Sequence, residues 1–166
     1  SIYELFGKNE KTIEAVDFFN KNAGISRNFK LSKFFKEGDV TQILRFYSKE
    51  CYKFFSKAAP ALGLRQFLGA IKTKDVKIYV LSGGEKEEII FFLKKNLLLE
   101  FFEEVLSSEK KKIDHLKEKD VSKDDIFIGD SNNDLESALK IGLKFILFRK
   151  YKSLKSFPSK RSIKNN

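Results

Sequence analysis

Two carboxylates, Asp130 and Asp134, lie four residues apart in the stretch IFIGDSNNDLESALKIGLKFILF, residues 126–148. Asp130 ends a short apolar run that predicts a buried strand, and Asp134 falls in the loop or first helical turn that follows. Both side chains can therefore converge on one point. Carboxylates held this close repel each other unless a cation lies between them. Magnesium suits such a site because it prefers oxygen ligands and retains several waters, so we expect Asp130 and Asp134 to be metal ligands.

The neighbours of this pair support the metal site but also allow a competing interpretation. Gly129 would let the backbone approach closely, and Asn133 adds a polar group beside the carboxylates. The competing interpretation is that Ser131, Asn132 or Asp134 simply caps the next helix. Because capping explains one of these residues but not the whole cluster, metal binding is the interpretation we prefer.

A serine followed by two glycines, in LSGG at residues 81–84, is the second candidate for chemistry. Ser82 closes a nearly all-apolar run that predicts a strand covered on both faces, and a helical pattern begins after the glycines. The Ser82 hydroxyl and the free N–H groups around Gly83 at the helix start can bind a phosphate. The alternative is an ordinary strand-to-helix turn.

A run of lysines in SSEKKKID, residues 107–114, is the third candidate. A lysine at the start of a helix here can reach the same pocket and neutralise phosphate and carboxylate charge. Lys110 is the first choice for this role and Lys111 the second. The alternative is a solvated face, which is the usual explanation of a charge run. His115, on the same helix, is assigned to the surface or the edge of the core rather than to catalysis.

Helical periodicity runs through the first third of the chain, and strands alternate with helices after it. Helices are expected, with a boundary at Gly38, over residues 2–23, 28–37, 39–57, 62–72, 85–95, 109–119 and 135–140. Strands are expected over residues 76–82, 104–106, 126–130 and 144–148. Such alternation predicts an α/β fold with a parallel, Rossmann-like sheet and flanking helices. Ligands in these sheets bind beyond the carboxyl ends of the strands, where Ser82 and Asp130 lie.

Taken in order, these features resemble the haloacid dehalogenase-like (HAD) hydrolase superfamily, in its phosphoglycolate phosphatase/β-phosphoglucomutase-like branch. Ser82 matches the strand-ending serine or threonine of the second motif, and Lys110 or a neighbour matches the lysine of the third. The fourth motif, GDSxxD, is matched residue for residue by Gly129, Asp130, Ser131 and Asp134. The resemblance covers roughly residues 60–148 by motifs and the first sixty by the topology of a helical cap.

The resemblance implies a magnesium-dependent phosphatase with an aspartyl-phosphate intermediate and a helical cap over its site. In this reading residues 1–60 form the small helical cap, 61–150 the Rossmann-like core, and 151–166 a loose basic tail. A small phosphorylated metabolite is the expected substrate because the cap encloses the site. Arg27, Lys30 and Lys33 near the middle of the cap hint at an anionic substrate.

The first motif of the family, DxDx[TV], is absent from these 166 residues. It ends the central strand and supplies the nucleophilic aspartate, and SIYELFGKNE at the start resembles what directly follows it. Without the nucleophile no aspartyl-phosphate can form, so the remaining residues would only bind metal and phosphate. Strands 76–81 and 126–129 would each have an unpaired inner edge, at ~1–3 kcal/mol for each buried unpaired group. We therefore expect another segment or chain to supply the missing strand, and no phosphatase activity from the 166 residues alone.

Composition excludes several classes of protein. One cysteine, Cys51, excludes an internal disulfide and a cysteine-rich zinc site, and predicts a buried structural thiol. No apolar run approaches the ~18–20 residues of a membrane span, and none follows a basic start as in a signal peptide, so a cytoplasmic protein without a membrane partner is expected. The net charge of +10 favours anionic partners, although an AT-rich genome would give the same lysine bias.

Three functions follow from these observations. The first is the magnesium-dependent phosphatase, and the second is a non-catalytic HAD-like protein that binds phosphate and metal. The third is a basic nucleic-acid-binding protein, whose affinity would fall steeply with salt. It ranks last because the aromatic residues recur at helical core spacing rather than among the basic residues.

Overall fold

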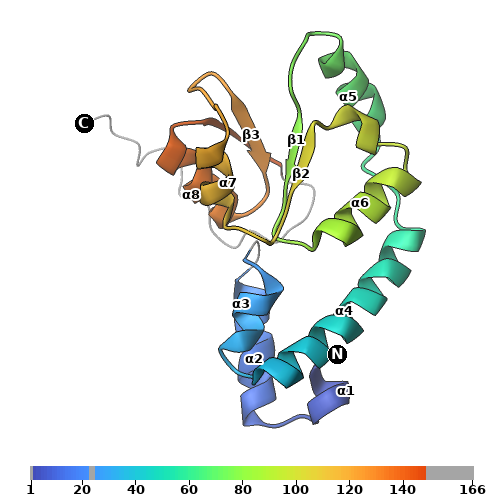
Figure 1. The fold of residues 1–166 in the computed structure, drawn as a ribbon, viewed down its shortest axis with the longest axis vertical. Coiled ribbons are helices and arrows are strands. Elements are labelled where there is room, and N and C mark those ends of the chain that lie inside the picture. Colours follow the sequence, from blue (N-terminus) through green and yellow to red (C-terminus); the bar gives the residue numbers. More distant parts are fainter. Residues whose placement is uncertain (1, 23–24, 149–166) are drawn as a thin grey trace. The chain divides into compact units, whose positions relative to one another are not determined.

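A computed structural model of the chain describes residues 2–22 and 25–148. The predicted basic tail at 151–166 lies outside the described residues. The chain divides into two compact units, residues 1–112 and 113–166 (Figure 1). The predicted boundary between cap and core near residue 60 stays a prediction. No helix within the described ranges has the length and apolar character needed to cross a membrane.

Four helices begin the first unit: α1 (Ile2–Phe6), α2 (Glu10–Lys21), α3 (Arg27–Ser32) and α4 (Glu37–Lys57). The single helix expected over 2–23 is wrong, because the chain turns at Gly7 with a φ of 72° and α2 starts anew. Asn9 caps α2 by accepting a hydrogen bond from the Thr12 N–H. The apolar faces of these helices pack together in one core cluster, which includes Ile2, Ala15, Leu31, Phe35, Val40 and Ile43.

The expected boundary at Gly38 is also wrong, because α4 begins at Glu37 and Gly38 lies inside its first turn. Glu37 and Asp39 place two negative charges in that turn, which the positive end of the helix dipole favours. One glycine costs a helix only ~1 kcal/mol, and the packing of Val40 and Ile43 offsets that cost.

The rest of the first unit alternates strands and helices: α5 (Leu64–Lys72), β1 (Tyr79–Leu81), α6 (Lys86–Lys95), the 3-10 helix η1 (Leu99–Phe101) and β2 (Glu104–Leu106). β1 and β2 run parallel, with Leu81 opposite Leu106. β1 is shorter than the predicted strand, although backbone hydrogen bonds continue the pairing at Ile78 and Ser82. A second core cluster, built on Leu68, Leu93, Leu98 and Val105, lies between this pair and its helices.

The second unit consists of α7 (Lys112–Glu118), β3 (Ile126–Gly129), α8 (Asn132–Ile141) and β4 (Lys144–Leu147), and β3 and β4 form a second parallel pair. Helix α7 starts one residue before the boundary between the two units. α8 packs against both strands and ends at Gly142, whose φ is 81°. The prediction that β3 is a buried strand is wrong, since Ile126 is 57% exposed and Ile128 46% exposed. The alternate residue Phe127 is half-buried and packs against Phe145 of β4. The prediction that β1 is covered on both faces is wrong as well, since Tyr79 is 38% exposed.

The α/β class with parallel strands and flanking helices is confirmed. In the described residues the strands form two sheets of two strands each, in the orders β1-β2 and β3-β4. One edge of β1 and one edge of β3 therefore have no strand partner within those residues. The carboxyl ends of the two sheets carry the candidate site residues.

Candidate functional site

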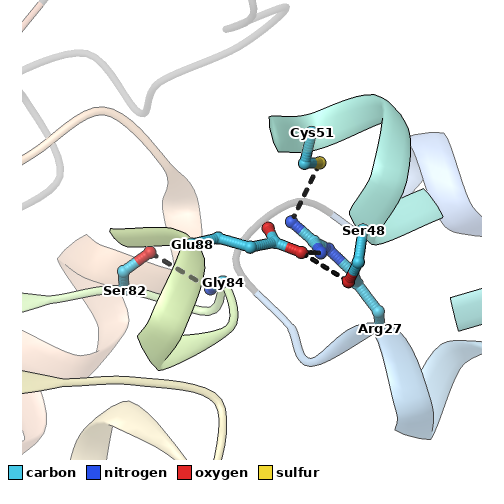
Figure 2. Close-up of polar contacts among 6 residues, drawn as sticks. All are labelled: Arg27, Ser48, Cys51, Ser82, Gly84 and Glu88. Atoms are coloured by element: carbon cyan, nitrogen blue, oxygen red, sulfur yellow. Dashed lines mark hydrogen bonds and ion pairs between the residues drawn. The ribbon is translucent and has the colours of Figure 1, made fainter. Parts of the chain in front are cut away.

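Ser82 lies directly beyond the carboxyl end of β1, where its backbone N–H still donates to the Leu106 carbonyl oxygen at 2.9 Å. Its Oγ accepts a hydrogen bond from the Gly84 N–H at 3.1 Å, which shapes the turn into α6 (Figure 2). A hydroxyl that accepts in this way keeps its own proton to donate to a ligand oxygen. Glu85, at the N-cap of α6, makes no side-chain capping bond.

The turn after β2, which carries Lys110 and Lys111, lies next to the Ser82 loop. The Ser108 N–H donates to the Gly84 carbonyl oxygen at 3.0 Å, so the turn after β2 is tied to the turn after β1. Parallel pairing of β1 and β2 causes this, because it brings their carboxyl ends to the same edge. Lys110 and Lys111 follow in that turn, and both are exposed.

The helix predicted over 109–119 begins later than expected, at Lys112. Glu109 bends back toward β2 instead, where its carboxylate accepts hydrogen bonds from the backbone N–H and the hydroxyl of Ser107. This local side-chain bonding competes with the first helical turn. Lys110 and Lys111 therefore precede α7, which differs from the expectation of a lysine just inside the helix.

The acidic pair lies at the carboxyl end of β3. Asp130 is exposed, whereas Asp134 is 3% exposed and is the third residue of α8. Asp134 Oδ2 accepts hydrogen bonds from the Asp130 N–H at 3.2 Å, the Ser131 N–H at 3.1 Å and the Ser131 hydroxyl at 2.8 Å. Ser131 Oγ accepts in turn from the Asp134 N–H at 3.2 Å. Asp134 thus belongs to a capping box, which is the competing interpretation of the sequence.

Gly129 permits this arrangement. A Cβ at position 129 would lie 2.5 Å from the Asp134 Cβ and 2.8 Å from its Oδ2, closer than any side chain tolerates. The expected close approach at Gly129 is therefore present. It holds the carboxylate of Asp134 against the strand end from which Asp130 projects.

The donor set at this point suits a magnesium ion coordinated in part by water. Within the described ranges, no three His, Cys, Asp or Glu side chains are grouped to hold a metal ion. Mg²⁺ commonly binds through only one or two carboxylates and completes its shell with waters and substrate phosphates. Asp130, with an exposed carboxylate, and Asp134, which is fixed beside it by the capping box, fit that requirement.

Comparison with known proteins agrees with the motifs. The family model described as haloacid dehalogenase-like hydrolase matches residues 2–148. The chain belongs to this family. No match was found among the curated proteins.

Solved structures of HAD-like hydrolases share the fold. A protein described as a haloacid dehalogenase-like hydrolase from Bacteroides fragilis is 18% identical with a TM-score of 0.62, covering 87% of this chain and 74% of that one. A haloacid dehalogenase-like family hydrolase from Streptococcus pneumoniae is 15% identical with a TM-score of 0.60, covering 88% and 72%. A second hydrolase from Streptococcus pneumoniae is 17% identical with a TM-score of 0.52, covering 89% and 79%.

The basic residues that hinted at an anionic substrate make internal contacts in this HAD-like protein. Lys30 is 6% exposed and donates to the carbonyl oxygens of Phe19 and Asn22 at 3.4 Å and 3.3 Å. Burial, together with the charge of Arg27, lowers the pKa of Lys30 to about 8. Lys33 lies over the Phe18 ring at 4.6 Å. Their presence in the sequence therefore gives no independent support for an anionic substrate.

Arg27 makes the contact that sequence reasoning missed. Its Nη1 donates to Glu88 Oε1 at 2.8 Å, and the guanidinium lies 4.3 Å from the centre of the Tyr47 ring. Burial lowers the pKa of Arg27, but the hydrogen bond and charge of Glu88 more than compensate, and the net shift is upward. Arg27 and Glu88 are 61 positions apart, and in the sequence each resembles part of an ordinary charged helix face.

Proposed function

We propose that this HAD-like chain holds the phosphate- and metal-binding residues of a magnesium-dependent phosphatase that acts on a small phosphorylated metabolite. The observation that carries the proposal is the end of β3. There an exposed Asp130 lies beside Asp134, whose carboxylate is fixed by three hydrogen bonds in a space that only glycine at 129 leaves open. Family membership supports the hydrolase class, and the finer assignment is ours.

In this proposal the first unit binds the transferring phosphoryl group. The Ser82 hydroxyl donates to one phosphoryl oxygen, and the backbone N–H of Gly83 donates to another. Lys110, or Lys111 as second choice, supplies positive charge from the turn that is hydrogen-bonded to the Ser82 loop. Fixed donors and charges of this kind stabilise the negative charge of the phosphoryl group during transfer.

Asp130 and Asp134 of the second unit would hold the magnesium ion. Bound there, the ion would supply Lewis-acid stabilisation of the phosphoryl oxygens. Asp130 has the accessible carboxylate, and Asp134 sets its surroundings by holding the Asp130 N–H.

The nucleophile must come from elsewhere in this scheme, because no DxDx[TV] sequence occurs in the 166 residues. We propose that a further segment or another chain provides it on a strand that pairs beside β1 or β3. The same absence favours a second candidate, a non-catalytic protein that binds phosphate and metal through the residues named above.

Magnesium titration calorimetry tests the metal site. We expect Asp130→Asn to weaken Mg²⁺ binding by roughly tenfold or more, because a coordinating charge is removed. Asp134→Asn should do the same, with circular dichroism as a check on folding since Asp134 also caps α8. Glu136→Gln on the same helix removes the same charge from an exposed position and should leave affinity unchanged. Equal affinity in the unaltered protein, Asp130→Asn and Glu136→Gln would refute the assignment.

A further inference from the structure

The ends of three helices border one another in the first unit (Figure 1). Near the end of α6, Lys95 Nζ donates to the carbonyl oxygens of Phe55 and Ala58 at 3.4 Å and 3.3 Å, which joins this end to the end of α4. Arg65, in the first turn of α5, donates to the carbonyl oxygen of Leu97, which directly follows the C-cap of α6. The end of α4, the start of α5 and the end of α6 therefore form one continuous region.

These helix ends carry the three most exposed of the large apolar side chains that the structure describes. Leu62 is 100% exposed in the turn before α5, Phe54 is 67% exposed near the end of α4, and Leu97 is 67% exposed after α6. Single exposed apolar residues are common on protein surfaces, but a group of them indicates a surface that contacts another body. We call Phe54, Leu62 and Leu97 the apolar patch.

Folding of the chain does not account for two residues of the apolar patch. Leu97 has a φ of 54°, in the left-handed region where a helix ordinarily ends on glycine. Glycine would remove that backbone strain, and a leucine that is mostly exposed packs on little in return. Leu62 directly precedes the N-cap of α5, where an apolar residue often packs on the fourth residue of the helix, here Phe67. Leu62 is fully exposed and makes no such contact.

The surroundings of the apolar patch are basic. Residues 51–74 include five lysines and arginines and no aspartate or glutamate, and Lys94 and Lys95 lie at the end of α6. Lys57 shares a face of α4 with Phe54, because residues three apart lie together on a helix. Three acidic residues border this surface, each in an exposed ion pair with a basic one: Glu50 with Lys53, Glu100 with Arg65 and Glu103 with Lys72. The basic residues outnumber them, so the surface is positive and suits an anionic partner.

We propose that the apolar patch attaches the protein to the surface of an anionic lipid bilayer. Phe54, Leu62 and Leu97 enter the boundary between headgroups and acyl chains, while Lys57 and Lys94 stay at the level of the lipid phosphates. A fluid layer accepts fully projecting side chains without a fitted pocket. A second copy of the chain fits less well, because two positive surfaces repel each other. Leucines also provide no stacking surface for nucleic acid bases.

This attachment does not depend on phosphate or metal binding. α6 has ten residues, so its two ends lie about 15 Å apart. The Ser82 loop precedes one end and the apolar patch lies at the other, so the two sites are separate. The expectation of no membrane partner came from the lack of a spanning run, and attachment at the surface requires none.

Sedimentation of the full chain with lipid vesicles tests the apolar patch. We expect binding to vesicles of phosphatidylcholine and phosphatidylglycerol mixed two to one, and weaker binding at high salt. Leu62→Ser should weaken binding by about tenfold, because a leucine side chain no longer leaves water. Ile13→Ser removes a 46% exposed apolar side chain of α2 and should leave binding unchanged. The basic segment at 151–166 is the same in both variants, so equal binding by both would overturn the proposal.

Leu97 separates binding from folding. Leu97→Gly should weaken vesicle binding by about fivefold or more. The same change should raise the urea midpoint of unfolding, because glycine adopts a positive φ without strain. A leucine that served folding would lose stability on this change, and that result would remove Leu97 from the apolar patch.

The charge around the apolar patch is tested in the same assay. Lys57→Gln should weaken binding by about fivefold at low salt, whereas Lys8→Gln, at an exposed position before α2, should leave it unchanged. No binding of the unaltered protein to the mixed vesicles would overturn the proposal. A dimer in analytical ultracentrifugation that Leu62→Ser dissociates would overturn it too, because the patch would then join two copies.

Discussion

At the scale of single residues, Gly129 controls the acidic site. Gly129→Ala would place a Cβ 2.5 Å from the Asp134 Cβ, so Asp134 must leave the N–H groups of Asp130 and Ser131. We expect the free energy of unfolding, measured by urea denaturation, to fall by about 1–3 kcal/mol. Gly38→Ala is the control, because nothing lies within 4 Å of its added methyl group in α4. That variant should be neutral or gain up to ~1 kcal/mol, and equal losses in both would contradict the prediction.

The lowered pKa of the buried Lys30 makes the free energy of unfolding depend on pH. Its pKa is about 8 in the folded protein against 10.5 ordinarily, so the unfolded chain binds more protons between these values. The free energy of unfolding therefore gains a contribution of up to about 3 kcal/mol from Lys30 as pH rises from 8 to 10.5. Below pH 8 lysine is charged in both states, and this contribution is absent.

Lys30→Met should remove that contribution. Burial raises the pKa of Cys51 and of Tyr47, which lowers stability above pH 9 in both proteins, so the difference between the two proteins isolates Lys30. We expect the difference in the free energy of unfolding to change steadily from pH 8 to 10.5 in urea titrations. Lys21→Met, at an exposed ion pair with Asp17, should run parallel to the unaltered protein. A parallel curve for Lys30→Met would show that Lys30 stays charged.

At the scale of elements, α8 depends on its capping box. Ser131→Ala removes the hydroxyl that donates to Asp134 Oδ2 and accepts from the Asp134 N–H. We expect a loss of about 1 kcal/mol in the free energy of unfolding and fewer protected amides in the first turn of α8 by hydrogen exchange. Ser56→Ala in α4 breaks only an exposed bond to the Lys53 carbonyl and should change stability by less than ~0.5 kcal/mol. Similar losses in both serines would argue against a special role for the cap.

The sequence was informative where the structure depends on local pattern. The amphipathic run at 85–95 predicts α6 to within one residue, and the strand at 104–106 coincides with β2. The break at Gly7 was missed and a break at Gly38 was wrongly expected, because a glycine ends a helix in one case and is tolerated in the other, according to the packing around it. Periodicity carries no information on that packing.

The same limit explains what was found and missed in the candidate site. The GDSxxD pattern places Asp134 against Gly129 through contacts five residues apart, so this local structure can be predicted from the sequence. The sequence does not decide whether Asp134 caps a helix or binds a metal, and the structure shows it capping α8. The Arg27–Glu88 pair joins residues 61 apart, and no pattern in one sequence marks it.

At the scale of the whole molecule, the proposal of a further strand concerns the edges of the two sheets. β1 pairs only with β2, and β3 only with β4, within the described residues. A pair of strands is marginal by itself, and an open edge is a template for another strand. The exposed Ile126 and Ile128 of β3 add apolar surface at the second pair. A further parallel strand would supply hydrogen-bond partners at these edges.

Joining such a strand to the chain tests stability and activity together. We expect the 166 residues alone to hydrolyse none of a panel of small phosphate esters, because they hold no nucleophile of the DxDx[TV] kind. Fused upstream to an apolar strand that ends in DxDx[TV], the protein should unfold at higher urea and show hydrolysis that a chelator abolishes. Replacing the first aspartate of that strand by asparagine should abolish hydrolysis and keep the gain in stability, since backbone pairing does not depend on that carboxylate. Equal turnover with and without the aspartate would place the nucleophile among the residues of this chain, and stability unchanged by the added strand would mean that the edges of β1 and β3 do not accept it.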